Sequence, residues 1–290
     1  MNKKYLLLDC NYLCHRAKHS MGSLSYEGAP TGVIYGFLKG LESYKDLFNT
    51  QQFIFCWDSK YSKRQELFPD YKYKRRNRKT ELTEEEIIWE NEFRKQMKKL
   101  RTDYLPIIGF KNIFCQKGYE SDDIIASLCL NLNKTNDEGV IITSDKDLYQ
   151  CVRSNISFYN PQKNKITTRL SFKKEYKIEP WNWKTIKVIA GCSTDEVPGA
   201  KGVGEKTAIK WFNGELSFES KAFKTIDDFI KTPKYKRNVK LIFLPFANTK
   251  TFKLKKDCLS KKGWEKVSKI LGMKSIRNKL PFKIKKRKKK

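Results

Sequence analysis

The amino-acid sequence predicts an α/β fold in which an open parallel β-sheet is covered by helices. Three apolar runs, at residues 5–8, 53–57 and 140–142, are hydrophobic throughout instead of alternating, which is typical of strands buried on both faces. Helical patterns separate these runs, and strands that alternate with helices form parallel sheets. A fourth, short strand is expected at residues 113–115.

The helices are predicted from their start signals and from the spacing of their apolar residues. Pro30 can open a helix whose apolar positions continue to Leu41. Thr83 and Glu86 form a capping box ahead of an amphipathic run that continues to Leu100. Both helices lie between predicted strands, as the α/β pattern requires.

Aspartates follow the three predicted strands. Asp9 ends the first run, Asp58 ends the second, and Asp145 comes shortly after the third. Ligands of open parallel sheets bind beyond the carboxyl ends of the strands, so these three side chains are expected to lie at one edge. Further carboxylates follow in the stretches GYESDD and SDKDLYQ: Glu120, Asp122, Asp123 and Asp147.

Any one of these acids could simply cap a helix, which stabilises it by about 0.3–1 kcal/mol. Capping does not explain why three separate strands also end in aspartate. Two carboxylates at ~4 Å and an effective dielectric of ~20 repel by about 4 kcal/mol, so a converging set needs cations. Ligands that are all oxygen atoms favour Mg²⁺ or Mn²⁺. The sequence therefore predicts a metal site at this sheet edge.

The composition calls for an anionic partner, because the chain of 290 residues carries a formal net charge of +29. Nucleic acid is the first candidate for this partner, and an anionic membrane surface is the second. Alternatively, the charge reflects an organism whose proteins are all rich in lysine, and then it indicates no partner. No apolar stretch is long enough to cross a bilayer, and the one near the start is too short for a signal peptide. Eight scattered cysteines without a CxxC pair predict reduced thiols and a cytoplasmic location, in the host if the protein is viral.

Two basic clusters also point to nucleic acid. Six of the eight residues at 72–79 are Lys or Arg, and Tyr71 and Tyr73 interleave with them, as a site for a single strand requires. Residues 279–290 are predicted to form a basic tail. The tail either attracts DNA without specificity or only solubilises or localises the protein.

A second module is expected over residues 181–278. Gly199, Gly202 and Gly204 precede a predicted helix at 205–212, and glycines there let backbone N–H groups approach a phosphate. The preceding strand and the GK[ST] ending of nucleotide-binding loops are missing. The pattern favours a helix–turn–helix clamp on a nucleic-acid backbone, with an ordinary glycine turn as the alternative.

The whole chain except the tail resembles the 5′-nucleases of the flap-endonuclease superfamily, in particular the bacterial polymerase-associated 5′→3′ exonuclease domain and its bacteriophage relatives. The family's motifs occur in order as LLLDCNYLCHRAKHS, FCWDSKYSKRQELFPDYKYKRR, GYESDD, TSDKDLYQ and GAKGVGEKTA. The resemblance implies a PIN-like parallel sheet over residues 1–180, with helices on both faces and a helical arch at about 73–104. It also implies a helix–three-turn–helix module that grips the duplex backbone.

The resemblance implies phosphodiester hydrolysis by two Mg²⁺ ions, for which Mn²⁺ can substitute. The metal ligands are then expected to be Asp9, Asp58, Glu120, Asp122 and Asp123 for one ion, and Asp145, Asp147 and Asp195 for the other. Lys72 and Arg75 are expected to neutralise the scissile phosphate. DNA contacts are expected at Arg16, Lys18, Tyr71, Lys201, Gly202, Gly204, Lys206 and Thr207, with K⁺ in the helix–three-turn–helix loop.

The implied substrate is DNA with 5′ flaps, nicks or 5′ ends, hydrolysed by a monomer during replication, repair or recombination. Whether RNA–DNA hybrids are also cleaved is left open, as is the preference between exonuclease and flap-endonuclease action. One alternative is a catalytically weak DNA-binding scaffold of the same fold, against which the retained carboxylates argue. Another is a PIN-type ribonuclease, against which the duplex-clamp motif GAKGVGEKTA argues.

One position departs from the family pattern. Where the family has glycine–aspartate–x–x–aspartate–asparagine, Cys192 replaces the first aspartate and Glu196 replaces the asparagine. Cysteine is a soft ligand and a poor partner for Mg²⁺, so the second metal site has lost a carboxylate. Glu196 could restore the charge from the next position. The expectation for Cys192 itself is a small, half-buried and inert residue.

Overall fold

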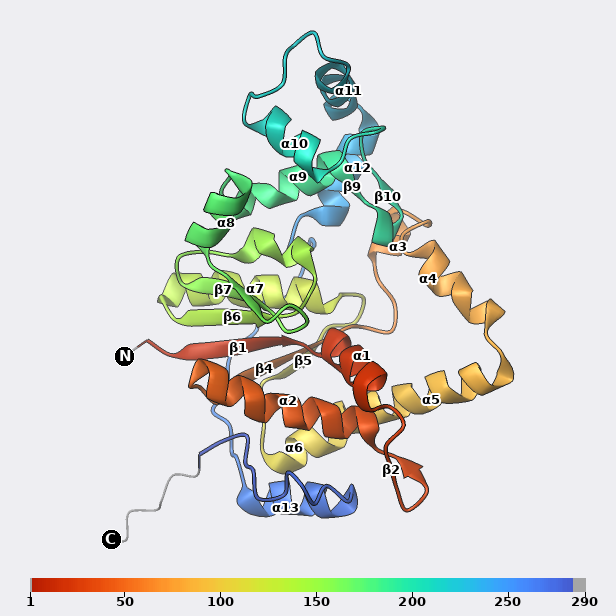
Figure 1. Ribbon diagram of the computed structural model, residues 1–290, viewed down its shortest axis with the longest axis vertical. Coiled ribbons are helices and arrows are strands. Elements are labelled where there is room, and N and C mark those ends of the chain that lie inside the picture. The colour runs from red at the N-terminus through yellow and green to blue at the C-terminus, as the bar shows by residue number, and fades with distance from the viewer. Residues whose placement is uncertain (1, 284–290) are drawn as a thin grey trace.

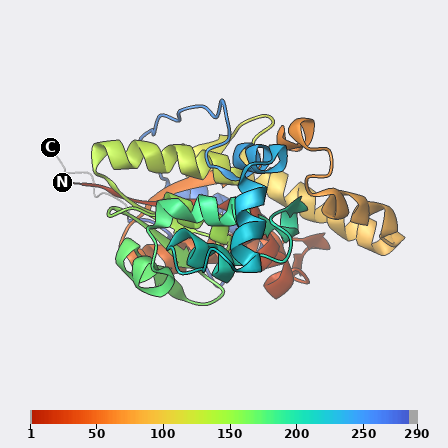
Figure 2. The same ribbon diagram turned by 90° about the horizontal axis from the view of Figure 1, so that it is seen from above.

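A six-stranded sheet forms the centre of the computed structural model, which describes residues 2–283 except the side chains of Lys79 and Thr80. The strand order is β5-β4-β1-β6-β7-β8, and all neighbouring strands run parallel except β7 and β8. Helices cover both faces (Figures 1 and 2), which confirms the predicted α/β fold. The strands are β1 (Lys4–Asp9), β4 (Gln52–Trp57), β5 (Ile113–Cys115), β6 (Glu138–Ile142), β7 (Ile156–Asn160) and β8 (Lys165–Thr167).

The central strands are apolar throughout because successive side chains point to opposite faces and both faces are covered. On β1, Leu6 and Leu8 pack in one hydrophobic cluster and Leu7 in another. Helices α1 (Cys10–Met21), α2 (Gly32–Phe48), α6 (Leu105–Ile108) and α13 (Lys261–Ile270) contribute to the first cluster. Helices α7 (Ser121–Thr135) and α9 (Trp183–Ala190) contribute to the second.

The remaining elements around the sheet are short, and one of them shifts the start of α2. Pro30 lies in a small hairpin, so α2 begins two residues later than predicted. The hairpin consists of β2 (Ser25–Tyr26) and β3 (Ala29–Pro30). The other short elements are α3 (Arg64–Leu67), η3 (Lys146–Cys151), α8 (Arg169–Tyr176) and η4 (Pro180–Asn182).

Residues 73–104 project from one side of the sheet as a bent pair of helices (Figure 1). They form α4 (Tyr73–Asn77), η1 (Arg78–Glu81), α5 (Glu84–Lys99) and the π-helical η2 (Leu100–Tyr104). The predicted capping box is confirmed, since the Thr83 and Glu86 side chains each accept from the other's backbone N–H. Phe93 of α5 packs 4.7 Å from the His15 ring, which anchors this arch on α1.

The clamp segment contains the glycine-rich turn, and two of its glycines have different roles. A Cβ on Gly199 would lie 2.3 Å from backbone atoms of Ile189 and Ala190, so this position needs glycine for close packing. Gly202 has a φ of +73° in open space, so it supplies the left-handed turn. The clamp comprises α9, β9 (Gly191–Cys192), η5 (Ser193–Asp195), β10 (Val197–Pro198), α10 (Glu205–Phe212), α11 (Lys221–Ile230) and α12 (Pro233–Ile242).

The predicted division at residues 181–278 needs a correction, because the chain returns to the sheet after α12. The Ser127 hydroxyl on α7 donates to the Lys250 carbonyl at 2.7 Å. Helix α13 then packs against α6 below the sheet (Figure 1). Phe282, within the predicted basic tail, is only 3% exposed and packs against Phe110. The clamp is thus inserted within the nuclease-like domain; residues 284–290 of the tail lie outside the described residues.

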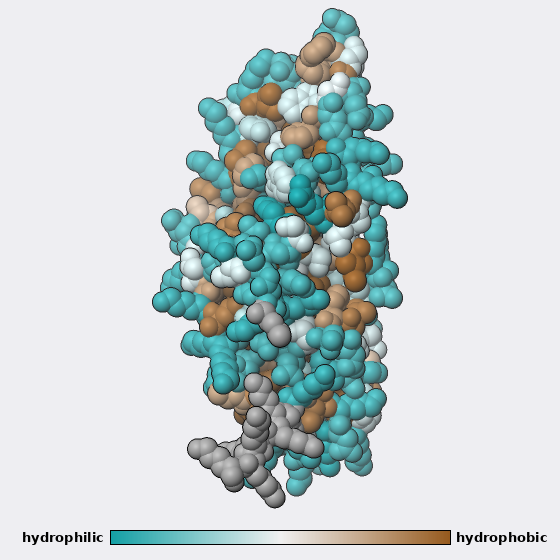
Figure 3. Space-filling model, turned by 90° about the vertical axis from the view of Figure 1, so that its left-hand side faces the viewer, coloured by the Kyte–Doolittle hydropathy of each residue, from teal (hydrophilic) through white to brown (hydrophobic). Residues whose placement is uncertain are grey.

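Within residues 2–283, no helix combines the length and the apolar character that a bilayer span requires. The side of the molecule in Figure 3 is mainly hydrophilic, with small and scattered hydrophobic patches.

Candidate metal and nucleic-acid site

Seven of the eight predicted carboxylates line one cavity of about 440 Å³ at the carboxyl edge of the sheet, and four of them form its all-oxygen group. Asp9 is the last residue of β1, and Asp58 directly follows β4. Asp122 lies in the first turn of α7, and Asp145 precedes η3. Because neighbouring parallel strands end at the same edge, residues far apart in the chain meet here.

Hydrogen bonds fix the carboxylates of Asp9 and Asp58. Asp9 accepts from the Thr143 hydroxyl at 2.8 Å and from the Ser121 hydroxyl at 3.2 Å. Asp58 accepts from the backbone N–H of Ser121 at 2.7 Å, and its own N–H donates to Asn11. Ser121, at the start of α7, therefore holds both carboxylates at once.

The cavity places negative charges where water solvates them poorly. Burial, and next the repulsion from Asp58, raise the pKa of Asp9 to about 7. Burial likewise raises the pKa of Asp58, with Glu120 as the next cause, and that of Asp122, with Asp145 as the next cause. A divalent cation among these oxygen ligands would favour their charged forms. The donor set therefore fits an ion such as Mg²⁺ or Mn²⁺.

This electrostatic arrangement predicts how metal-free stability depends on pH. The pKa of Asp9 is 3.8 unperturbed and about 7 in the folded protein, so the folded state binds more protons between these values. Stability of the metal-free protein should therefore fall as pH rises through this window. We expect a lower melting temperature at about pH 8 than at about pH 5, and excess Mg²⁺ should raise it most at the higher pH. Asp9→Asn should make the metal-free profile less steep, since Asp58 and Asp122 still titrate, whereas a flat profile in the native protein would contradict the assignment.

Glu120 differs from these four acids because it already has cationic partners. The Lys72 ammonium lies 2.8 Å from its Oε2 atom, and Arg64 lies at 3.9 Å. The Tyr71 hydroxyl donates to the same oxygen at 3.0 Å. Although burial opposes it, the attraction of Lys72 and then Arg64 lowers the pKa of Glu120 to about 2. Glu120 is therefore charged and partly neutralised before any metal binds.

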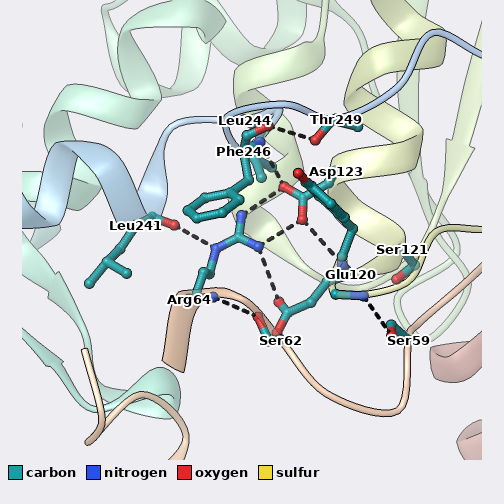
Figure 4. A network of polar contacts seen from close by, with 12 residues as sticks. Ser59, Ser62, Arg64, Glu120, Ser121, Asp123, Leu241, Leu244, Phe246 and Thr249 are labelled. Atoms are coloured by element: carbon teal, nitrogen blue, oxygen red, sulfur yellow. Dashed lines mark hydrogen bonds and ion pairs between the residues drawn. The ribbon is translucent and has the colours of Figure 1, made fainter. Parts of the chain in front are cut away.

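Asp123 does not face the cavity, so its prediction as a metal ligand is wrong. It is fully buried, and both of its oxygens lie 2.7 Å from the Arg64 guanidinium (Figure 4). The backbone N–H groups of Phe246 and Glu120 also donate to it. These four contacts occupy the carboxylate, so its role is to hold the loop that carries Glu120.

No sequence pattern indicated a role for Arg64, yet its guanidinium binds the Asp123 carboxylate outside the cavity. Its side chain is 3% exposed, and its Nε donates to the Leu241 carbonyl at 2.8 Å. Its guanidinium lies 4.7 Å from the Phe246 ring centroid (Figure 4). Arg64 thus ties α3 to the start of α7, to the end of α12 and to the returning chain.

A second group of candidate ligands lines the same cavity and consists of Asp147, Cys192 and Asp195. The Cys192 thiol lies 3.7 Å from an Asp147 oxygen and 3.1 Å from the Thr194 hydroxyl. Burial, and next the charge of Asp147, raise the pKa of this thiol to about 12. The expectation of a half-buried residue is wrong, because Cys192 is 6% exposed.

Lys187 also reaches this group, and sequence reasoning missed it. Its ammonium lies 3.2 Å from Asp147 and 3.2 Å from Glu205, the first residue of α10. Glu196 does not line the cavity, and within the described residues its buried Oε2 has no hydrogen-bond partner. The structure therefore does not bring Glu196 together with the carboxylates that line the cavity.

The predicted basic and DNA-contacting residues divide into four sets, of which the fourth lies on α1. Lys72 and Arg75 line the cavity at the base of the arch. Tyr71 is only 3% exposed, with its hydroxyl bonded to Glu120 and Asp195, so it cannot stack on a base in this conformation. The exposed or half-exposed residues of the clamp loop are Lys201, Gly202, Gly204, Lys206 and Thr207.

The two predicted contacts on α1 also differ from each other. Arg16 is exposed beside a separate cavity of about 230 Å³ between α1 and α2. Lys18 pairs with Glu90 at 3.2 Å and lies over the Phe93 ring. Lys18 therefore joins α1 to the arch helix α5, in addition to any contact with DNA.

Comparison with known proteins identifies the class to which this fold and site belong. Residues 4–177 match the family described as 5′-3′ exonuclease, N-terminal resolvase-like domain. The 5′-3′ exonuclease of Bacillus subtilis is 32% identical over 219 residues, which cover 72% of this chain and 69% of that protein. The chain belongs to the 5′-3′ exonuclease family of the 5′-nuclease superfamily.

Two further comparisons define the extent of the likeness. The thermostable DNA polymerase I of Thermus thermophilus is 31% identical over 215 residues, which cover 71% of this chain but only 23% of the polymerase. The fold is similar to that of the bacteriophage T5 flap endonuclease crystallised with DNA and metal ions. The TM-score is 0.71 at 19% identity, over 84% of this chain and 90% of the phage protein.

Proposed function

We propose that this chain is a structure-specific 5′-nuclease that hydrolyses phosphodiester bonds of DNA at 5′ ends, nicks and flaps. The observation that carries the proposal is the single cavity in which Asp9, Asp58, Asp122 and Asp145 meet below the arch. Membership of the 5′-3′ exonuclease family supports the same activity.

Each set of residues has a proposed role. Asp9, Asp58, Asp122 and Asp145 hold one divalent ion, with Glu120 at their edge, while Asp147 and Asp195 contribute to the second. Bound divalent ions supply an activated water and stabilise the attacking and leaving oxygens. Lys72 and Arg75, which line the same cavity, attract the scissile phosphate and stabilise its developing charge.

The clamp and the arch are proposed to position the DNA. The glycine-rich turn before α10 presents Gly202, Gly204 and the exposed Lys201 and Lys206 to the duplex backbone. We also propose that this loop binds K⁺ through carbonyl oxygens. The basic run that begins at Lys72 would hold the single strand that leaves the duplex, with Tyr73, which is 51% exposed, as the accessible aromatic ring.

The wider setting is proposed on the same basis. All eight cysteines are free, which supports the reducing cytoplasm, in the host if the protein is viral. The proposed active form is a monomer, and the proposed metals are Mg²⁺ or Mn²⁺. RNA–DNA hybrids are proposed as a further substrate for primer removal.

The proposal is tested with a duplex that carries a labelled 5′ flap. Incubation with Mg²⁺ should release short labelled products, whereas an excess of chelator should abolish release. A duplex with a 3′ flap and no free recessed 5′ end serves as the substrate control. Tight binding of the 5′-flap duplex without cleavage by Mg²⁺, Mn²⁺ or Co²⁺ would overturn the proposal and favour a DNA-binding scaffold.

Lys72→Ala tests the role of the cation at the arch base. The single-turnover rate should fall by about 10²–10³-fold, because one preorganised group that stabilises developing charge is removed. The dissociation constant for flap DNA should change by less than about tenfold, or ~1.4 kcal/mol. Lys266→Ala is the control, since Lys266 is exposed on α13, outside both the cavity and the basic run at 72–79. If Lys72→Ala lost rate and affinity by the same factor, Lys72 would contribute only to DNA binding, and its assignment as a group that stabilises the developing charge would be wrong.

A further inference from the structure

The second group of candidate ligands contains a sulfur atom, whereas the neighbouring group offers only oxygen. Asp147, Cys192 and Asp195 each offer one ligand atom, and these atoms all lie within 4.8 Å of one another. An ion with ligand distances of about 2.0–2.3 Å contacts ligand atoms that lie up to about 4.6 Å apart, so small side-chain movements suffice. Cys192 is buried but lines the cavity, so its sulfur is accessible from the site.

The charges around this group are unfavourable for a hard ion. Mg²⁺ would find a thiol beside the two carboxylates, and Asp147 already contacts the Lys187 ammonium at 3.2 Å. Glu196 does not line the cavity and therefore adds no ligand. Since Mg²⁺ requires near-octahedral oxygen ligands and loses its water reluctantly, the sulfur atom cannot replace the missing carboxylate.

We propose that the group formed by Asp147, Cys192 and Asp195 selects a thiophilic divalent ion of the Zn²⁺, Co²⁺ or Cd²⁺ class over Mg²⁺. Cys192 binds such an ion through sulfur and releases its thiol proton to water. The all-oxygen group keeps its preference for Mg²⁺ or Mn²⁺, so two adjacent sites in one cavity prefer different metals. The inference rests on the proposed function, because it treats this group as part of the metal site of a nuclease.

Cobalt absorption tests whether sulfur binds the ion. The full chain is titrated with Co²⁺ and followed in the near ultraviolet, where thiolate-to-cobalt charge transfer absorbs and carboxylate ligands do not. The native protein should develop this band, and Cys192→Ser should lose it. Cys258→Ser is the matched control, because Cys258 is exposed and lies outside the cavity, and this variant should keep the band.

Calorimetric titration of the same proteins measures the metal preference. Cys192→Asp should bind Mg²⁺ about tenfold or more tightly than the native chain, since even outer ligands change metal affinity by about 10–100-fold. The same variant should bind Cd²⁺ more weakly. Thermal unfolding of each variant establishes that it is folded, and Cys192→Ala replaces Cys192→Ser if serine prevents folding.

Three outcomes would overturn the inference: no cobalt band at saturation, a band that survives removal of the Cys192 thiol, or equal Mg²⁺ affinities in the native chain and Cys192→Asp. Cleavage of the 5′-flap duplex, measured in parallel, separates this inference from the proposed function. Cleavage without a cobalt band overturns the metal preference alone. A band without cleavage by any metal supports the preference and overturns the nuclease assignment.

Discussion

Asp58→Asn should eliminate most of the cleavage activity while leaving the fold and DNA binding in place. Asp58 lines the cavity and accepts a hydrogen bond from Ser121 at 2.7 Å, which the amide oxygen of asparagine can still accept. The variant loses a negative ligand, so metal-dependent stabilisation of the reaction should weaken by about 10²–10³-fold or more. Affinity for flap DNA should stay equal or increase, because one charge that repels phosphate is gone. Single-turnover cleavage and fluorescence anisotropy measure the two effects.

Asp46→Asn provides the control for this experiment. Asp46 lies on α2, and its side chain is 67% exposed beside Lys45, so its replacement should change neither rate nor affinity. Full cleavage by Asp58→Asn at saturating Mg²⁺ would remove Asp58 from the ligand set. Loss of cleavage together with a large fall in melting temperature would show that Asp58 supports the fold instead.

Asp123→Asn should act through stability and not through the metal. The substitution removes the nearer carboxylate of the buried Arg64 guanidinium and leaves it the longer, 3.9 Å contact with Glu120; breaking a buried pair in this way costs about 3–5 kcal/mol of unfolding free energy. Urea-induced unfolding monitored by circular dichroism measures the loss. In the fraction that remains folded, the Mg²⁺ concentration at half-maximal cleavage should match that of the native chain. An unchanged unfolding free energy with a shifted Mg²⁺ dependence would return Asp123 to the metal site.

Two further variants show whether the stability loss in Asp123→Asn comes from the buried charge pair: a double replacement of Arg64 and Asp123, and a replacement in an exposed ion pair. Arg64→Met combined with Asp123→Leu should lose less stability than the two single changes together, because no charge is then left unpaired in the interior. Lys165→Met breaks a pair of similar length, 2.8 Å, whose side chains are 52% and 43% exposed. Its cost should be only about 0–1 kcal/mol. Additive losses in the double variant would show that Arg64 and Asp123 act independently.

Hydrophobic periodicity and helix start signals correctly predicted the strands and helices whose formation depends mainly on neighbouring residues in the sequence. The apolar runs at 53–57 and 140–142 became β4 and β6, and the helix expected at 205–212 has the bounds of α10. The carboxyl ends of the strands also indicated where Asp9 and Asp58 would meet. These predictions needed only periodicity and the geometry of parallel sheets.

The errors concern side chains whose surroundings come from distant parts of the chain. Asp122 and Asp123 are consecutive in a helix, so they point about 100° apart, and one faces the cavity while the other faces Arg64. Helical geometry could have indicated that both cannot face one cavity. Nothing in the sequence could have indicated Arg64 as the partner, because 59 residues separate it from Asp123. The burial of Tyr71 likewise depends on its long-range contacts with Glu120 and Asp195.

The return of the chain after the clamp has a consequence for biosynthesis. Trp264 and Phe282 complete the hydrophobic cluster that also contains Leu105 and Ile108, yet they leave the ribosome after the whole clamp has been made. A growing chain cannot close this cluster early, because its last side chains do not yet exist, and such late contacts between distant residues slow folding. The sheet should therefore reach its final packing only after the clamp has been synthesised. A chain interrupted within the clamp would lack the side chains that close the hydrophobic cluster on this face of the sheet.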